Sequence, residues 1–162
     1  MDDEKKDICC QEFNPVGWDG KTHFWKDKLF IKDKIPQLFH IPIPAMIGKM
    51  ITKQWKKATD AGAAPDLKDF LWLSYDPSPW VSEHYIYVTK EVPDAENVMF
   101  TGNYISKVFD GPYNYAPKWM KEMDKYLKDI NQTPKKYYFY FTTCPKCAKK
   151  HGHNYVVLFA QV

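Results

Sequence analysis

Hydrophobic and polar positions alternate in several short segments of the chain, and this period of two predicts β-strands. An extended segment is expected from about Ile35, where prolines disfavour a helix. Strands are expected over residues 70–75, 84–92, 98–109, 137–141 and 154–162, with Gly102 marking a bend or bulge in the strand 98–109. Apolar residues recur with helical spacing over 45–61 and 116–130, and each of these helices begins beside a proline. The second helix is expected to bury one stripe, formed by Trp119, Met120, Met123, Tyr126, Leu127 and Ile130.

The order of these elements occurs twice along the chain. The separation between Tyr85 and Tyr155 equals that between Phe39 and Phe109, which favours a duplicated module. We therefore predict an α+β fold of two pseudo-symmetric strand-helix-strand-strand modules, 35–93 and 94–162, with antiparallel sheets and one helix each. Together they would form a single domain over 35–162. Residues 1–34 are expected to be an irregular lead-in packed on this domain.

Each predicted sheet has two chemically different faces, because successive side chains of a strand point in opposite directions. Tyr138 and Tyr140 share one face of their strand, and Tyr85 and Tyr87 share one face of another. The opposite faces are apolar and suit a covering helix. A hydroxyl-bearing aromatic face in both modules favours a semi-polar ligand cleft between them, where rings stack on a flat molecule.

Composition narrows the classes of partner. The chain has no arginine, and its formal charge of +3 comes from lysine alone, which argues against a dedicated nucleic-acid binder. The N-terminus, MDDEKKDICC, lacks an apolar signal core, and nowhere do 18 apolar residues follow one another. We expect a cytoplasmic protein with no membrane among its partners. Nucleophile-elbow, phosphate-loop and dinucleotide motifs are also missing from the sequence.

Three segments of the chain resemble the GyrI-like small-molecule-binding domains of bacteria. They are WLSYDPSPW followed by EHYIYVTKEVP, the TGNYISKVFDGPY turn, and an ending, CPKCAKKHGHNYVV, similar to a standalone subgroup labelled as hydrolases. The family includes domains of multidrug-responsive regulators, a gyrase-inhibitory protein and hydrolases of reactive cyclopropane-bearing natural products. The resemblance implies two modules around an aromatic cleft, often with a carboxylate beneath the ligand.

Glu83 is the acid that fits this implied position, because the last strand, 154–162, contains none. As a general base it would activate water, and burial against aromatic rings is expected to raise the pKa of Glu83 toward a useful range. Glu83 as an ordinary exposed acid is the alternative, and Glu91 is a weaker candidate. The expected ligand-binding residues are aromatic: Trp72, Trp80, Tyr85, Tyr87, Tyr104, Tyr113, Trp119, Tyr138 and Tyr140.

Cys144 and Cys147 have the spacing of half a zinc site within a connection between strands. The remaining ligands would be Cys9 and Cys10, or His151 and His153. Free thiols and a disulfide are alternatives to a structural zinc ion, and no other cofactor is required. Haem binding by a similar duplicated fold would need His40 or His84 as the axial ligand.

The sequence thus leads to two hypotheses. In the first, the protein binds a flat hydrophobic small molecule in an aromatic cleft and hydrolyses a reactive xenobiotic or natural product. In the second, it is a non-enzymatic interaction or effector-sensing protein, with gyrase or a regulator as its protein partner.

Overall fold

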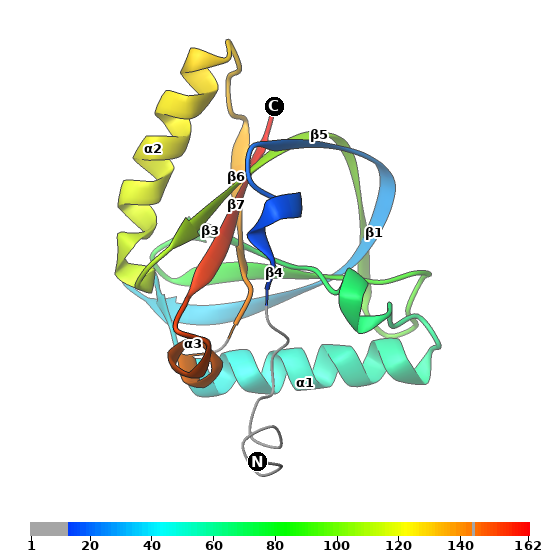
Figure 1. Cartoon of the computed structure of the whole chain (residues 1–162). Coiled ribbons are helices and arrows are strands. Elements are labelled where there is room, and N and C mark those ends of the chain that lie inside the picture. The colour runs from blue at the N-terminus through cyan, green and yellow to red at the C-terminus, as the bar shows by residue number, and fades with distance from the viewer. Residues whose placement is uncertain (1–12, 144) are drawn as a thin grey trace, which may run out of the picture. The chain divides into compact units, whose positions relative to one another are not determined.

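The computed structural model describes residues 13–143 and 145–162, which form two compact units. The central unit is Phe24–Gly102. The terminal unit combines residues 13–23 with Asn103–Val162. Both divisions between the units fall inside long strands, β1 (Lys21–Leu38) and β5 (Glu96–Asp110), which are traced in Figure 1.

The remaining strands and helices follow in the expected α+β order. They are β2 (Ile41–Pro42), α1 (Pro44–Asp60), β3 (Trp72–Ser78), β4 (Val81–Tyr87), α2 (Ala116–Asp129), β6 (Lys136–Phe141), α3 (Pro145–His151) and β7 (Tyr155–Gln161). Short 3-10 turns lie at Pro15–Gly17, Leu67–Asp69 and Tyr113–Tyr115. The predicted fold class, antiparallel strands with few helices, is confirmed, whereas the pseudo-symmetry of the two modules stays a prediction.

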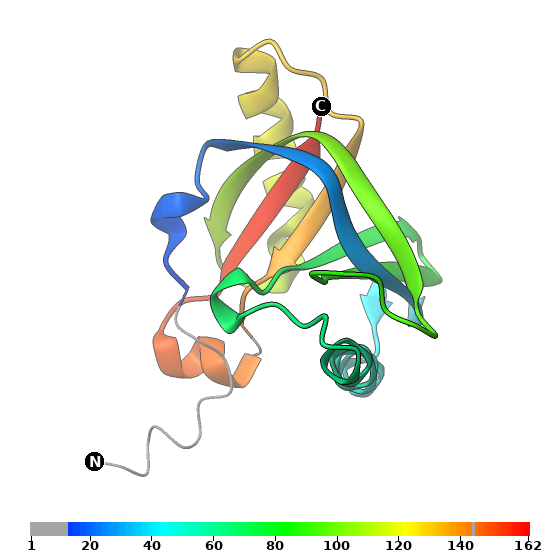
Figure 2. The same cartoon turned by 90° about the vertical axis from the view of Figure 1, so that its right-hand side faces the viewer.

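In the central unit the strands lie in the order β2–β1–β4–β3, and each pair is antiparallel. Ile31 on β1 lies opposite Ile86 on β4, and both pack with Met50 and Ala58 of α1. α1 begins at Pro44, whose fixed φ suits a first helical turn, and the chain leaves it at Gly62, where φ is 65°. One face of this sheet is therefore covered by α1; Figure 2 views that helix end-on.

In the terminal unit the strand order is β6–β7–β5, again antiparallel. Val156 and Leu158 of β7 pack with Met123 and Leu127 of α2, all with no measurable exposure. Figures 1 and 2 both show α2 alongside these strands. The apolar face predicted for this module is thus the face that its helix covers.

Two expectations about the helices and the chain's start are wrong. Residues 21–34, expected to be irregular, belong to β1, and from Phe30 onward cross-strand pairing with β4 compensates for weak alternation. The stripe of α2 is narrower than expected. Met120 is 37% exposed and Ile130 41% exposed, while Trp119, Met123 and Leu127 are buried.

The strand expected over 84–92 is shorter and begins earlier, as β4. After Tyr87 the backbone turns to a loop, since the Thr89 N–H donates to the Ala63 carbonyl rather than to a strand. Val88 and Val92 remain in the α1 core. The segment after Cys144, expected to be a loop, forms the short helix α3. Within the described residues, no helix is long and apolar enough to cross a membrane.

Candidate functional site

The face of the central sheet that points away from α1 carries the candidate site. Alternation along β4 places Ile86 toward α1 and therefore Glu83, Tyr85 and Tyr87 on the other face. Strand pairing brings Tyr75 of β3 opposite Glu83, and Lys32 of β1 opposite Tyr85. This tyrosine face thus gathers one carboxylate, one ammonium group and three phenols from three strands.

Three of these side chains are in direct contact. The Tyr85 hydroxyl donates to Glu83 Oε2 at 2.7 Å, and Lys32 Nζ lies 3.2 Å from Glu83 Oε1. Lys32 Nζ is also 5.6 Å from the centre of the Tyr85 ring. The Glu83 side chain is 16% exposed and that of Lys32 is 17% exposed. The carboxylate is therefore held by one donor on each oxygen, close to the surface but largely out of water.

An aromatic cluster supports this Lys32–Glu83–Tyr85 group. The buried Tyr85 ring packs against Phe100 with centres 5.0 Å apart, and Phe100 lies 4.7 Å from Phe30. Trp25 completes the cluster at 6.0 Å from Phe30. Rings that interlock in this way fix the direction of the Tyr85 hydroxyl, and the hydroxyl in turn fixes the carboxylate.

The Glu83 carboxylate keeps some contact with solvent, because its side chain is 16% exposed. An ionised carboxylate can only accept hydrogen bonds, and the groups that Tyr85 and Lys32 direct at Glu83 are both donors. Lys32 was not predicted from the sequence. The available signal was its position two residues after Phe30, because residues two apart on a strand share a sheet face.

The expected tryptophan walls do not share this face. Trp72 lies opposite Ile86 and packs on the α1 core, so it points to the other side of the sheet. Trp80 lies in the β3–β4 turn and is 53% exposed. The centre of its ring is 5.3 Å from that of Phe39, which follows β1. Tyr87 is on the tyrosine face, but Lys28 Nζ covers its ring at 4.0 Å.

In the terminal unit, the expected residues divide in the same way. Tyr104, Tyr138 and Tyr140 lie on the sheet face opposite α2, and all are buried. Trp18 packs against Tyr140 at 6.1 Å on that face. Burial raises the pKa of Tyr104. Trp119 is on the helix side, stacked on Phe109 in the core, so it is not a wall of this face.

Tyr113 lies in the turn before α2, 39% exposed. Its hydroxyl donates to the Thr143 carbonyl at 3.1 Å, and its ring meets Phe141, which packs against the α2 core. Tyr113 therefore also lies on the helix side of the terminal sheet.

A buried polar network lies beneath α1. His84 is 3% exposed; its Nδ1 accepts from Trp72 Nε1 at 3.1 Å and contacts Ser74 Oγ at 3.2 Å. The ring proton is therefore on Nε2, which donates to Ser82 Oγ at 2.8 Å. Burial lowers the pKa of His84 to about 4, with Asp33 acting in the opposite direction. Both ring nitrogens are thus engaged in a neutral network.

Sequence reasoning also missed a serine–histidine pair in the terminal unit. His23 Nε2 lies 2.7 Å from Ser106 Oγ, but the Ser106 hydroxyl donates to the Trp18 carbonyl at 2.5 Å. His23 must then donate to Ser106, which is the reverse of the arrangement that activates a serine nucleophile. Ser106 is also fully buried. The pair holds the start of β1 and does not form a catalytic dyad in this geometry.

The expected metal ligands are only partly within the described residues. Cys9, Cys10 and Cys144 lie outside them. Cys147 is fully buried in α3, and His153 Nδ1 lies 2.8 Å from Asp110 Oδ2. Burial alone would raise the pKa of Asp110, but hydrogen bonds from His153 and the Asn154 N–H outweigh it and lower the pKa. Over 13–143 and 145–162, no three His, Cys, Asp or Glu residues form a metal cluster, so zinc stays a prediction.

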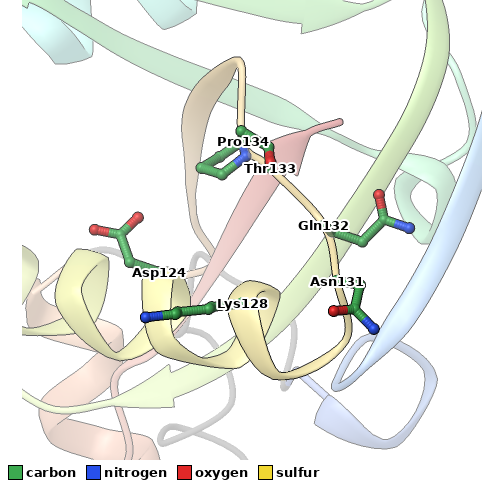
Figure 3. A pocket seen from close by; sticks show the side chains of 6 residues that line it. All are labelled: Asp124, Lys128, Asn131, Gln132, Thr133 and Pro134. Carbon is green, nitrogen blue, oxygen red and sulfur yellow. The ribbon is translucent and has the colours of Figure 1, made fainter.

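A surface depression lies where α2 leads into β6, outside the tyrosine face. It is lined by Asp124, Lys128, Asn131, Gln132, Thr133 and Pro134. Figure 3 shows the side chains of Asp124 and Lys128 pointing away from those of Asn131 and Gln132. Groups that do not converge on one point make a poor ligand site.

A second depression borders the tyrosine face, between β1 and the end of β4. Lys28 lies there between the rings of Trp25 and Tyr87. Burial lowers the pKa of Lys28, and Asp69 acts in the opposite direction.

The fold is that of an α+β protein, and the Lys32–Glu83–Tyr85 group is a candidate acid–phenol–ammonium site on one face of its central sheet. A family model described as "Bacterial hydrolase" matches residues 1–162, and the chain belongs to this family. No functionally curated protein matches the chain.

Solved structures with the same fold share little sequence with it. The C-terminal domain of EcmrR aligns with a TM-score of 0.65 at 8% identity, covering 89% of this chain and 96% of that one. A hydrolase from Listeria innocua aligns with a TM-score of 0.59 at 13% identity, covering 99% of this chain and 96% of that one. An uncharacterized conserved protein from Listeria innocua aligns with a TM-score of 0.62 at 9% identity, covering 98% of this chain and 96% of that one. Likeness at such identities shows the fold alone.

Proposed function

We propose that the protein binds a flat, hydrophobic, electrophilic small molecule on the tyrosine face of the central sheet and hydrolyses it with Glu83 as general base. The observation that carries this proposal is the carboxylate of Glu83, fixed by Tyr85 and Lys32 and still reachable from solvent. Membership of the bacterial hydrolase family supports the reaction class. Cyclopropane-bearing or epoxide-like electrophiles are the substrate class that we propose, and the cytoplasm is the proposed compartment.

In the proposed reaction, Glu83 accepts a proton from a bound water as the water oxygen attacks the electrophilic carbon. A carbon–oxygen bond forms, and the strained carbon–carbon or carbon–oxygen bond of the ring breaks. The electron pair of the broken bond stays on the leaving atom, which then receives a proton from Glu83 or from water. The overall reaction adds one water molecule to the substrate and gives the ring-opened alcohol, so no oxidant or reductant is needed.

Tyr85 and Lys32 act as positioning residues in this scheme. Tyr85 keeps Glu83 Oε2 in one orientation through its hydroxyl, which the ring cluster with Phe100 immobilises. Lys32 holds the other carboxylate oxygen, Oε1, at 3.2 Å. The expected acceleration comes from the placement of the carboxylate beside the reacting water.

The test begins with a panel of planar aromatic epoxides, with diol formation followed by chromatography. Quenching of tryptophan fluorescence reports binding independently, since Trp25 lies in the ring cluster behind the site. Hydrolysis above the buffer rate with at least one member is expected, and Lys32→Met should lower the rate at unchanged quenching. If no member of the panel is bound or turned over, the proposed site does not have this function.

The second hypothesis, a non-enzymatic interaction protein, has a separate observation in its favour. Several large apolar side chains are exposed together at one end of the central unit. None of them belongs to the Lys32–Glu83–Tyr85 group.

A further inference from the structure

Five exposed apolar side chains gather where β1 turns into β2 and β3 turns into β4. We call them the apolar tip: Leu38 (59% exposed), Phe39 (73%), Ile41 (69%), Ile43 (42%) and Trp80 (53%). Single exposed apolar residues are ordinary on protein surfaces, but a contiguous group marks an interaction site. The rings of Phe39 and Trp80, from the two turns, are 5.3 Å apart, so the two turns form one surface.

The tip is held in its exposed conformation by the backbone. Phe39 and His40 both have positive φ, 49° and 66°, a conformation that costs energy for a bulky residue. The His40 N–H donates to the Pro79 carbonyl at 3.1 Å, and the Gln37 N–H to the Trp80 carbonyl at 2.8 Å. These bonds tie the two turns together. The turn therefore presents Phe39 outward instead of folding it onto the core.

Polar side chains reinforce the same turns. The Gln37 side chain is buried, and its Nε2 donates to Asp76 Oδ1 at 2.6 Å and to the Ser78 carbonyl at 2.7 Å. His40 Nδ1 lies 2.7 Å from Asp76 Oδ2. The buried Gln37 and the exposed His40–Asp76 pair thus hold the two turns in one arrangement under the apolar side chains.

A row of lysines begins near the tip. Ile43 immediately precedes α1, so the tip lies at the N-terminal end of that helix. Lys49, Lys53 and Lys56 are exposed and follow one another at helical spacing, which places them on one side of α1. We call these three residues the lysine stripe. Lys53 Nζ lies 3.8 Å from Asp33 and Lys56 Nζ lies 2.6 Å from Asp60, both in surface ion pairs that headgroup phosphates can replace. Lys49 lies about 8 Å along the axis from the helix start, given a rise of 1.5 Å per residue.

We propose that the apolar tip and the lysine stripe bind the surface of a membrane that contains anionic phospholipid. Insertion of the tip would bury its aliphatic and aromatic side chains among acyl chains, with Trp80 at the headgroup level. The lysine stripe would lie against the negatively charged headgroups. This contact is peripheral, so it differs from our expectation of no membrane partner, which rested on the lack of a spanning segment.

The shape of the tip favours a membrane over a protein. The exposed parts of these five side chains alone fall short of the roughly 800 Å² per partner of a stable protein interface, which also counts against a second copy of the chain. A protruding turn inserts into lipid without a complementary pocket, whereas a protein partner would have to supply one. The lysine stripe adds a preference for negative charge that a plain apolar contact would not need.

Co-sedimentation with vesicles tests the proposal on the full chain. Binding is expected to vesicles of phosphatidylglycerol and phosphatidylcholine, to be much weaker with phosphatidylcholine alone, and to fall as salt is raised. The double variant Phe39→Ser, Ile41→Ser should reduce binding at least tenfold. Leu67→Ser is the matched control, because Leu67 is 63% exposed but lies outside the tip.

Charge reversal tests the stripe separately. Lys49→Glu and Lys53→Glu should each weaken binding about fivefold or more, whereas Lys26→Glu, at an exposed position on β1, should not. Thermal unfolding of each variant shows that it is folded. No binding to anionic vesicles, or binding that Phe39→Ser, Ile41→Ser leaves unchanged, overturns the proposal. Self-association that this double variant abolishes would also overturn it, by assigning the tip to a second copy.

Discussion

Protonation of the buried His84 is expected to destabilise the fold as the pH falls. The imidazole is neutral in the folded protein, with Trp72 donating to Nδ1 and Nε2 donating to Ser82. Burial lowers its pKa to about 4 from the ordinary value of 6.5, whereas the unfolded chain keeps the ordinary value. The unfolded state therefore binds a proton first, and folding stability is lost as the pH falls from 6.5 toward 4.

The size of this loss follows from linkage. A shift of one pKa unit corresponds to about 1.4 kcal/mol, so the full difference amounts to about 3 kcal/mol, of which about 2 kcal/mol is lost by about pH 5. The Asp33 carboxylate faces His84 across the β1–β4 pair and favours the charged imidazole, but burial is the larger effect. A loss of this size is a large part of the stability of an ordinary domain.

Urea unfolding at about pH 7.5 and about pH 5 measures the effect. The wild-type protein should lose about 2 kcal/mol between these values, and His84→Gln, which cannot be protonated, should show a much smaller change. His151→Gln is the matched control and should keep the wild-type difference. A wild-type difference that His84→Gln preserves would refute the assignment of this pH dependence to His84.

Three further predictions concern packing, backbone and metal. Met123→Ala should cost roughly 2–5 kcal/mol in urea unfolding, because Met123 is fully buried against α2's sheet, while Met120→Ala should cost less than about 1 kcal/mol. Gly111→Ala should destabilise by about 1 kcal/mol or more, since φ is 150° and the added carbon would lie 3.2 Å from the Tyr115 ring; an unchanged melting temperature would contradict this. Elemental analysis should find zinc in a one-to-one ratio if the Cys144–Cys147 pair binds it, and only trace metal would end that hypothesis.

Much of the fold could be predicted because local pattern and tertiary packing agree. α1 and α2 have proline at the first turn and a stripe of apolar residues, so their bounds came within a residue or so of the structure. β1 was missed from Lys21 onward because its burial is irregular and its pairing with β4 is not visible in one strand's sequence. Local periodicity cannot report a partner that is distant along the chain.

The sequence predicts which side chains of one strand share a sheet face, but not which side chains of neighbouring strands are in contact. Alternation correctly separated Tyr85 from Ile86, since it depends on the strand alone. Trp72 was grouped with Tyr85 because both are aromatic, and only the register of β3 against β4 places Trp72 on the helix side. Lys32 was missed for the same reason, because its distance to Glu83 depends on the pairing of β1 with β4.

The rate of ring opening in Glu83→Gln tests the central claim most directly. The glutamine side chain has the size of glutamate and can keep the contact with Tyr85, but it cannot accept a proton from water. Glu91→Gln, at an exposed position, is the control. With the best epoxide of the panel, Glu83→Gln should lower the turnover rate by roughly a hundredfold or more, with fluorescence quenching retained and Glu91→Gln unaffected. Wild-type turnover in Glu83→Gln would contradict the account and remove Glu83 from the reaction.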